Sequence, residues 1–365
     1  MKEELTFLVT WEKDKKRTWS GTCWGLYNSL SNFYKITDYD LRYQPSLLER
    51  IGKKMRIISD GFGTKDILRQ RKKLSNHLNG KTVFQFSEII DNTNQPIYIY
   101  QDLNVSYVRY MYQNLPQIFK VSNFKYSNIH DIKQREELQN NFYKNCTGIF
   151  TMGKWLEKYL TEQCNIPSHK VHHVGGGINL NADEVDDSFK ENNKILFIGR
   201  DFERKGGYII YNAFKKLKEE IPNLELYVAG PSINPIGESI KGYHWYGDCS
   251  HEELSKLFNK CDIFCMPSYF EAYGLVFIEA LTYGLPCLGR NAYEMPYFIQ
   301  DGETGLLIED DNLDEVVRKI KKLLTCQYFK DNVRRQKEWY IKEYSWKTVA
   351  QRIKNIINKE KEYEI

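Results

Sequence analysis

The sequence has no long apolar run. None of its segments reaches the about 20 residues that a membrane-spanning helix needs, and residues 1–19 begin with charges around a short apolar run at 5–9. We therefore expect neither a signal peptide nor a transmembrane helix. The eight cysteines are scattered, and Cys261 and Cys265 have no second cysteine pair or histidine at zinc spacing. This pattern favours reduced thiols in a cytoplasmic protein over a zinc site or a disulfide framework.

A strong charge of either sign is also missing. The 52 Lys and Arg residues nearly balance the 48 Asp and Glu residues, and the net charge of +4 is too small to indicate a nucleic-acid partner. A hydrophobic content of 41% and a charged content of 27% are typical of a folded globular protein and exclude a disordered chain. The length of 365 residues is enough for two domains, each with its own core.

Short apolar runs alternate with helical patterns along the chain, which predicts an α/β protein with two parallel-sheet domains. The expected strands include residues 5–10, 83–86, 97–100, 148–152, 195–198, 224–229 and 263–266, and the expected helices include 26–33, 46–58, 65–78, 136–143, 207–219 and 276–282. We expect a first domain over 1–185, a second over 186–345 and a basic C-terminal helix over 346–365 that packs back on the first domain. Ligands in such domains bind beyond the carboxyl ends of the strands and in the cleft between domains.

Two glutamates eight positions apart are the most informative feature. A buried strand over 263–266 is followed by a loop, Gly274 and a helix that begins at Leu275. The free backbone N–H groups of Leu275 and Val276 and the helix dipole then form an anion site. Glu271 precedes this helix and Glu279 lies about one turn inside it. Since carboxylates repel phosphate, we expect both to accept hydrogen bonds from sugar hydroxyls. Alternatively, Glu271 is an N-terminal helix charge and Glu279 is solvated.

Two cations follow the expected strand over 195–198. Arg200 and Lys205, after Gly199, can neutralise a diphosphate at the carboxyl end of that strand. Two fixed cations and a helix N-terminus can replace a metal ion, so no metal is expected. The alternative is that both side chains cover the loop and pair with Asp201 and Glu203. Arg204 is set aside because we expect it to point outward.

These residues occur in an order and at a spacing that resemble the C-terminal half of family 4 glycosyltransferases. The matching positions span roughly 195–310 and are Gly199, Arg200, Lys205, Gly206, Gly230, Gly247, Pro267, Glu271-x7-Glu279, Gly284, Pro286 and Gly302 to Gly305. The resemblance implies the GT-B fold, in which two Rossmann-like parallel-sheet domains face each other across a cleft. It also implies retaining, metal-independent transfer of a hexose-type sugar from a UDP- or GDP-linked donor, without a cofactor. The acceptor would be a glycan or glycolipid in polysaccharide biosynthesis.

The resemblance extends to individual positions. Glu271, Arg200 and Lys205 would act in catalysis, while Glu279 would hold the ribose hydroxyls. Donor contacts would come from Gly199, Gly274, Leu275 and Val276, from Tyr246 near the nucleotide base, and from Tyr273, which stands where most relatives have phenylalanine. In the first domain, Gly21 and Thr22 stand at the place of the family's glycine-rich loop. Gln101 takes the place of a histidine near the sugar, with Asp102 next, and we include both in the catalytic set. Alternatively, Gln101 and Asp102 only cap the next helix.

Basic side chains gather on two expected helices of the first domain. Lys65, Arg69, Lys72 and Lys73 share one face of the first helix, and Arg50, Lys53 and Lys54 line the other. Such faces contact anionic lipid at the inner side of a membrane, or are simply solvated. Two other functions remain open. A nucleotide-sugar 2-epimerase would turn over the donor without acceptor, and a noncatalytic GT-B subunit would only bind a sugar or a partner.

Overall fold

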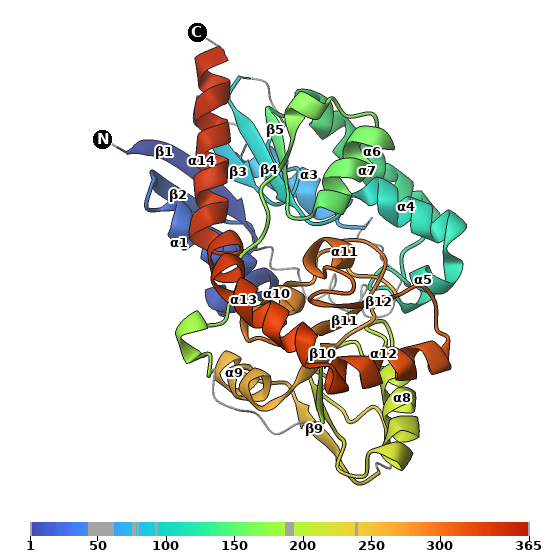
Figure 1. The fold of residues 1–365 in the computed structure, drawn as a ribbon. Coiled ribbons are helices and arrows are strands. Elements are labelled where there is room, and N and C mark those ends of the chain that lie inside the picture. Colours follow the sequence, from blue (N-terminus) through green and yellow to red (C-terminus); the bar gives the residue numbers. More distant parts are fainter. Residues whose placement is uncertain are drawn as a thin grey trace. The chain divides into compact units, whose positions relative to one another are not determined.

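The computed structural model describes residues 2–42, 62–74, 78, 80–91, 94–186, 193–237 and 240–363. The chain forms two compact units (Figure 1). Unit 1 comprises Met1–Gly177 together with Trp346–Ile365, and unit 2 comprises Ile178–Ser345. Each contains one six-stranded sheet whose paired strands are all parallel. The predicted α/β class with two parallel-sheet domains is therefore confirmed. The expected helix over 46–58, with Arg50, Lys53 and Lys54, lies outside the described residues.

The sheet of unit 1 has the strand order β2-β1-β3-β4-β5-β6. Its strands are β1 (Glu3–Val9), β2 (Tyr34–Asp40), β3 (Val83–Gln85), β4 (Ile97–Gln101), β5 (Gly148–Thr151) and β6 (Val171–His173). All residues of β3, β4 and β5 are buried, as expected for central parallel strands that helices cover on both faces. Strand β1 lies between β2 and β3, so the chain crosses from one side of β1 to the other after β2.

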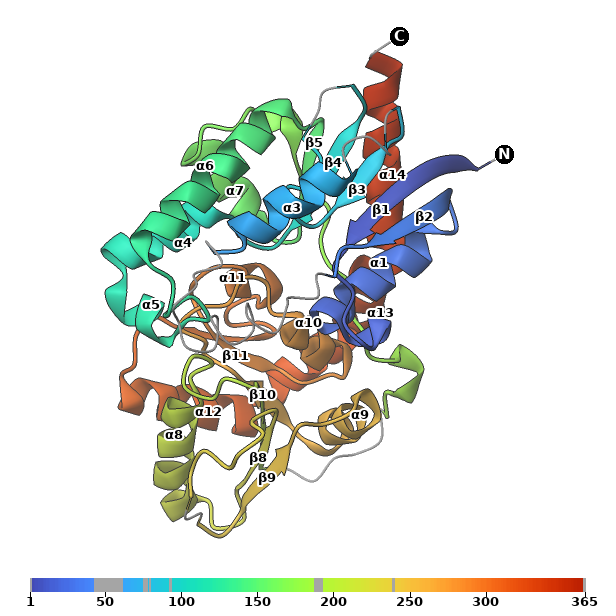
Figure 2. The same cartoon turned by 180° about the vertical axis from the view of Figure 1, so that it is seen from behind.

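Helices cover both faces of this sheet. They are α1 (Thr22–Leu30), α3 (Thr64–Leu74), α4 (Val105–Asn114), α5 (Pro116–Val121), α6 (Ile129–Asn145), α7 (Lys154–Glu162) and α14 (Trp346–Tyr363), with the 3-10 segments η1 (Lys15–Gly21) and η2 (Ser168–Lys170). Helix α14 packs beside α1, and α3 contacts α6 on the opposite face (Figures 1 and 2). The indole of Trp346 fills the space in which a side chain on Gly25 or Gly177 would lie. The last helix is thus part of the unit that contains β1.

The sheet of unit 2 has the order β12-β11-β10-β7-β8-β9. Its strands are β7 (Lys194–Ile198), β8 (Glu225–Ala229), β9 (Tyr243–Gly247), β10 (Ile263–Cys265), β11 (Cys287–Arg290) and β12 (Gly305–Ile308). The covering elements are η3 (Ala182–Glu184), α8 (Gly207–Glu220), α9 (His251–Lys260), α10 (Leu275–Thr282), α11 (Met295–Phe298), α12 (Leu313–Thr325) and α13 (Gln327–Glu343). Because the chain leaves β7 first toward β8 and later toward β10, the carboxyl ends of β7 and β10 form the topological switch point where ligands bind in this class of sheet.

The boundaries of α1 differ from the expected helix over 26–33. The helix begins at Thr22 because Gly21, with φ of 92°, turns the chain directly into it, and it ends at Leu30. Helices α4 and α6 begin after Asn104 and Asn128, whose side chains accept hydrogen bonds from backbone N–H groups of the first turn. Within the described part of the chain, no helix combines the length and apolar character needed to cross a bilayer.

Candidate active site

The loops that follow β7 and β10 meet at the switch point of unit 2. Gly206 has φ of 78°, and a Cβ atom there would lie 2.6 Å from the carbonyl oxygen of Pro267. The Tyr269 N–H donates to the carbonyl of Arg204 over 2.9 Å. Glycine at 206 therefore allows the two loops to approach closely, so that residues 66 positions apart in the sequence become neighbours.

This approach brings Lys205 against Glu271. The Lys205 ammonium donates to Oε2 of Glu271, and the two side chains are only 13% and 12% exposed. Burial lowers the pKa of Lys205, the charge of Glu271 opposes that change, and neighbouring Arg204 adds to it. The alternative that Lys205 pairs with Asp201 or Glu203 is therefore wrong. The two residues selected from separate sequence motifs form one ion pair.

Arg204, which we expected to point outward, points inward. Its side chain is 12% exposed, donates to the carbonyl of Phe270 over 2.6 Å and lies 3.8 Å from the carboxylate of Glu271. Arg200 has the opposite environment, because its side chain is 72% exposed and lies 3.6 Å from Asp248. The site thus has two cations that hold Glu271 and one cation that faces solvent beside them.

A second arginine supports the Glu271 loop and was missed in the sequence. Arg290, the last residue of β11, lies 4.8 Å from the ring of Tyr269 and 2.6 Å from Asp311. The Tyr269 hydroxyl donates to the same Asp311 carboxylate over 2.8 Å. This contact set ties the β10 loop to the segment after β12. Only the parallel register of β10, β11 and β12 brings these residues together, so no local motif could have revealed them.

Helix α10 starts where the sequence predicts. Gly274 has φ of 96°, and the position of its missing Cβ lies 3.1 Å from Cγ of Glu271. The side chains of Leu275 and Val276 are half-buried at the first turn. A glycine here lets the loop turn tightly into the helix N-terminus, whose backbone N–H groups favour an anion.

Glu279 is buried on the inner side of α10 and is 8% exposed. Its carboxylate accepts a hydrogen bond from the Asn179 N–H over 3.3 Å. Burial raises the pKa of Glu279 from its usual 4.5 to about 7, although this hydrogen bond opposes the rise. The alternative that Glu279 is a solvated helix residue is therefore wrong. A buried carboxyl group with a pKa near neutrality is typical of a binding or catalytic position.

The two tyrosines of the predicted donor site differ in exposure. Tyr273 is buried at 3% exposure and packs edge to face on Phe298, with ring centroids 5.0 Å apart. Tyr246 is 46% exposed at the end of β9, next to Gly247. Trp245 is 40% exposed, and its indole N–H donates to the Pro231 carbonyl over 2.9 Å. The end of β9 thus offers accessible aromatic surface, whereas Tyr273 serves the packing of the site.

In unit 1, Gln101 belongs to a buried polar network. The Tyr143 hydroxyl donates to the amide oxygen of Gln101 over 2.6 Å, and the amide nitrogen donates to Glu88 over 3.4 Å. Asn104, and not Gln101 or Asp102, caps α4 through its side chain. The alternative that Gln101 and Asp102 cap the next helix is therefore wrong. The side chain of Gln101 is held inside the unit, while Asp102 is half-buried at the end of β4.

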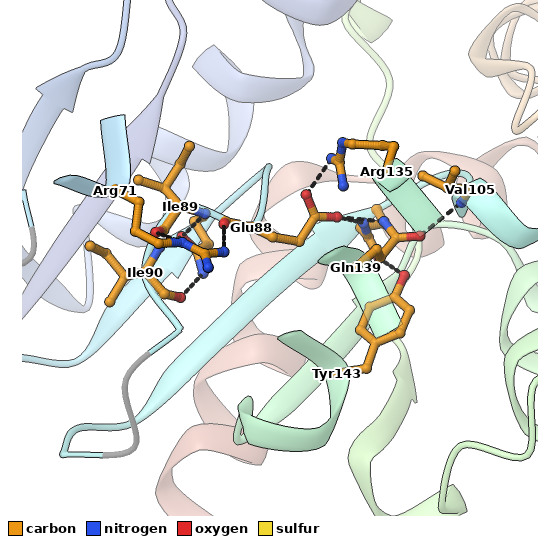
Figure 3. A network of polar contacts seen from close by, with 10 residues as sticks. Arg71, Glu88, Ile89, Ile90, Val105, Arg135, Gln139 and Tyr143 are labelled. Atoms are coloured by element: carbon orange, nitrogen blue, oxygen red, sulfur yellow. Dashed lines mark hydrogen bonds and ion pairs between the residues drawn. The ribbon is translucent and has the colours of Figure 1, made fainter. Parts of the chain in front are cut away.

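Glu88 is the centre of that network. Its side chain has no exposed surface, pairs with the guanidinium of Arg135 and accepts a hydrogen bond from Gln139. Arg71 donates to the backbone carbonyls of Glu88 and Ile89 over 2.8 Å and 3.2 Å (Figure 3). These contacts fix the segment after β3 beside the end of β4. The network therefore positions the carboxyl edge of this sheet, where Gly21 and Thr22 also lie at the start of α1.

Candidate metal ligands do not gather in the described residues, because no group of three His, Cys, Asp or Glu side chains is close enough to hold an ion. The sequence contains one Asp-x-Asp pattern in β2, at Asp38 and Asp40, a pattern that in some enzymes holds a metal ion between phosphates. Asp38 accepts from the Trp11 indole and pairs with Lys15, and Asp40 pairs with Arg42. These carboxylates are therefore engaged in local contacts within unit 1.

Comparison with known proteins finds a family match within the second unit. Residues 181–339 match the family described as glycosyl transferases group 1. Similar curated proteins include an uncharacterized 41.2 kDa protein in the cps region of Klebsiella pneumoniae, which is 28% identical over 47% of this chain. The sulfoquinovosyl transferase SQD2 of Arabidopsis thaliana is 30% identical over 44%, and the lipopolysaccharide glucosyltransferase WaaG of Escherichia coli is 30% identical over 36%. The chain covers 50%, 32% and 37% of these relatives, so it spans half of their length or less.

Solved structures resemble nearly the whole chain. A crystal structure of WaaG, a glycosyltransferase involved in lipopolysaccharide biosynthesis, matches 95% of this chain and 98% of its own, with a TM-score of 0.69 and 14% identity. The sucrose-phosphate synthase of Thermosynechococcus elongatus matches 98% of this chain and 99% of its own, with a TM-score of 0.70 and 14% identity. At this identity the likeness shows the fold, which is GT-B.

Proposed function

We propose that this chain is a glycosyltransferase that moves a sugar from a nucleotide-diphosphate donor to a hydroxyl acceptor. The observation that carries the proposal is the Lys205–Glu271 pair at the carboxyl ends of β7 and β10, directly before the N-terminus of α10. A cation, a carboxylate and an anion-binding helix end are the groups that a sugar diphosphate requires at its reacting bond. The match of residues 181–339 to glycosyl transferases group 1 supports it.

In this proposal, different residues of unit 2 bind different parts of the donor. The backbone N–H groups of Leu275 and Val276 bind the diphosphate, with Arg200 and Lys205 as counter-charges. Glu279 accepts hydrogen bonds from the ribose hydroxyls, and Glu271 does the same for the transferred sugar. Gly199 leaves space at the end of β7, where Lys205 already packs 2.8 Å from the position of a missing Cβ. The accessible aromatic surface at Tyr246 meets the nucleotide base.

In the proposed reaction, configuration at the sugar carbon is retained. The bond from C1 of the sugar to the diphosphate oxygen breaks, and a bond from C1 to the acceptor oxygen forms on the same face. The acceptor proton passes to the departing diphosphate, so no protein base is required. Arg200 and Lys205 stabilise the negative charge that develops on that leaving group. Because the departing diphosphate takes the acceptor proton, a chain with glutamine at position 101 can carry out the transfer without a protein base, a metal or a cofactor.

The proposal includes a UDP- or GDP-linked hexose as donor and a glycan or glycolipid as acceptor, in the assembly of a surface polysaccharide. Unit 1 would receive the acceptor at the carboxyl edge of its sheet, near Gly21, Thr22 and Asp102. Exposed cations on α3, namely Lys65, Arg69, Lys72 and Lys73, would bring the enzyme to the anionic inner surface of a membrane. Liposome co-sedimentation with and without anionic lipid tests this last part.

Nucleotide binding is the first test. Thermal shift and calorimetry with UDP, GDP and ADP should show one preferred nucleotide, with the same affinity in EDTA and in magnesium. Arg200→Ala and Lys205→Met should each weaken binding by roughly tenfold or more, because a charge-assisted phosphate contact contributes about 1.5–3 kcal/mol. Arg318→Ala, which removes an exposed cation on α12, is the matched control and should leave affinity unchanged.

Turnover then separates transfer from the other two functions. Glu271→Gln keeps the shape of the side chain and should abolish release of nucleotide in the presence of acceptor glycans. Isomerisation of the donor sugar without acceptor would instead identify an epimerase. A wild-type chain that binds none of the three nucleotides would contradict the proposed donor site and favour a noncatalytic subunit.

A further inference from the structure

The turn before α1 has an unusual backbone. Trp19 and Ser20 have φ of 49° and 54°, and Gly21 follows with φ of 92°. Among the non-glycine residues that the structure describes, they are the one adjacent pair with positive φ. A bulky residue adopts this left-handed conformation only where its surroundings impose it, and such residues gather at functional sites.

Contacts from two other strands hold Trp19 in this position. Its ring lies 5.6 Å from that of Phe86, which directly follows β3, and 6.0 Å from that of Tyr100 in β4, edge to face in both pairs. Tyr100 is fully buried and fixed by a hydrogen bond from its hydroxyl to the Gly175 carbonyl over 2.8 Å. Trp19 and Phe86 each keep part of their surface exposed. The indole is thus pre-oriented and only partly covered.

The location is the switch point of the first sheet. Strand β1 has β2 on one side and β3 on the other, and the segments that carry Trp19 and Phe86 follow the carboxyl ends of β1 and β3. Ligands bind at this point in open parallel sheets. The strained turn therefore lies where the fold of unit 1 provides a binding edge.

A carboxylate follows the strand that contains Tyr100. Asp102 immediately follows β4, two positions after Tyr100. Burial raises the pKa of Tyr100, and the charge of Asp102 raises it further. Burial also raises the pKa of the Cys23 thiol at the start of α1, to which the charges of Glu12 and Asp102 add. A partly exposed tryptophan that packs on Tyr100, and a carboxylate two positions after Tyr100, offer an apolar face and a strong hydrogen-bond acceptor.

We propose that Trp19 and Asp102 form a saccharide subsite in unit 1. The indole stacks on the C–H face of a pyranose ring, whose hydrogens are attracted to the electron-rich face of the aromatic system. The Asp102 carboxylate accepts hydrogen bonds from the hydroxyls at the edge of the same ring. The proposal deepens the proposed function, because the bound saccharide is the sugar of the acceptor. The held orientation of Trp19 reduces the entropy lost on binding.

Saturation-transfer NMR on the full chain tests this subsite. The probes are the methyl pyranosides of glucose, galactose, mannose and N-acetylglucosamine, and affinity is obtained by titration. At least one probe should bind, with transfer strongest to the hydrogens of one ring face. Trp19→Leu and Asp102→Asn should each weaken that probe at least tenfold, whereas Trp19→Phe should retain most of the affinity. Trp339→Leu, which removes a 48% exposed tryptophan on α13, is the matched control.

Nucleotide binding is measured on the same samples, so that failure of the saccharide subsite can be distinguished from failure of the proposed donor site. A wild-type chain that binds nucleotide but none of the four glycosides overturns the subsite and leaves the donor site intact. Glycoside binding without nucleotide binding supports the subsite and contradicts the proposed transferase function. Wild-type affinity in folded Trp19→Leu overturns the subsite. If that variant does not fold, as judged by circular dichroism, wild-type glycoside affinity in Asp102→Asn overturns it instead.

Discussion

Glu279→Gln should stabilise unit 2 above neutral pH and weaken nucleotide binding at the same time. Glu279 is buried, and this burial raises the pKa of its carboxyl group to about 7 in the folded chain, from the ordinary value of 4.5 that applies when the chain is unfolded. Below 4.5 both states hold the proton and the group has no effect. As pH rises from 4.5 to 7, the unfolded state alone loses the proton, so folding stability falls. Above 7 the loss is complete.

The magnitude follows from these two values. Each pH unit between them corresponds to 1.36 kcal/mol, so ionised Glu279 destabilises the fold by about 3 kcal/mol at pH 8. Glutamine cannot ionise, and its amide oxygen can still accept the hydrogen bond from Asn179. For a unit of this size, about 3 kcal/mol corresponds to a rise in Tm of roughly 6–12 °C. The gain should be near zero at pH 4.5.

Urea denaturation of wild type and variant between pH 4.5 and pH 8.5 measures this difference. The free-energy gap should open across that window and level off above about pH 7. A gap that does not change with pH would show that Glu279 is ionised in the folded state throughout, and would refute the reasoning. Calorimetry with the preferred nucleotide tests the predicted loss of affinity, which we expect because a neutral amide is a weaker acceptor for ribose hydroxyls than a carboxylate. Unchanged affinity would remove the ribose role.

The remaining predictions concern two packed positions. Glu88→Gln should lower the free energy of unfolding, measured by urea denaturation, by about 3–5 kcal/mol, because it leaves the buried guanidinium of Arg135 without its counter-charge. Glu4→Gln, in an exposed ion pair, should lower it by less than about 1 kcal/mol. Equal losses in the two variants would contradict the argument. Gly206→Ala should lower Tm more than Gly302→Ala, since both have positive φ but only the first would place a methyl group against backbone.

The sequence predicted the site of unit 2 better than its supporting contacts. Gly274 and the apolar residues after it are a local pattern, and α10 begins where that pattern predicts. Glu271 and Lys205 were each selected from their own motif, but their pairing depends on the adjacency of β7 and β10, which no local rule contains. The inward turn of Arg204 follows from the same adjacency, because its acceptor is the carbonyl of Phe270.

In unit 1, sequence patterns predicted less of the site. The glycine at position 21 was recognised, but the strained conformation of Trp19 before it depends on rings from β4 and the segment after β3. Gln101 was expected beside the sugar, yet its amide groups contact Tyr143 and Glu88, which lie 42 and 13 positions away. Helices α4 and α5 were not predicted. Three tyrosines, two valines and a terminal asparagine give α4 a weak helix propensity that tertiary packing overrides, and α5 has only six residues.

Helix α14 is synthesised after the whole of unit 2, although it packs within unit 1. During translation, unit 2 can therefore fold while unit 1 still exposes the apolar surface that Val349, Ile353 and Ile357 later cover, since all three are fully buried in the folded structure. The half-made protein would be a client for chaperones in that interval. Stopping translation after Ser345 should accordingly damage the unit that was made first and leave the unit made second intact.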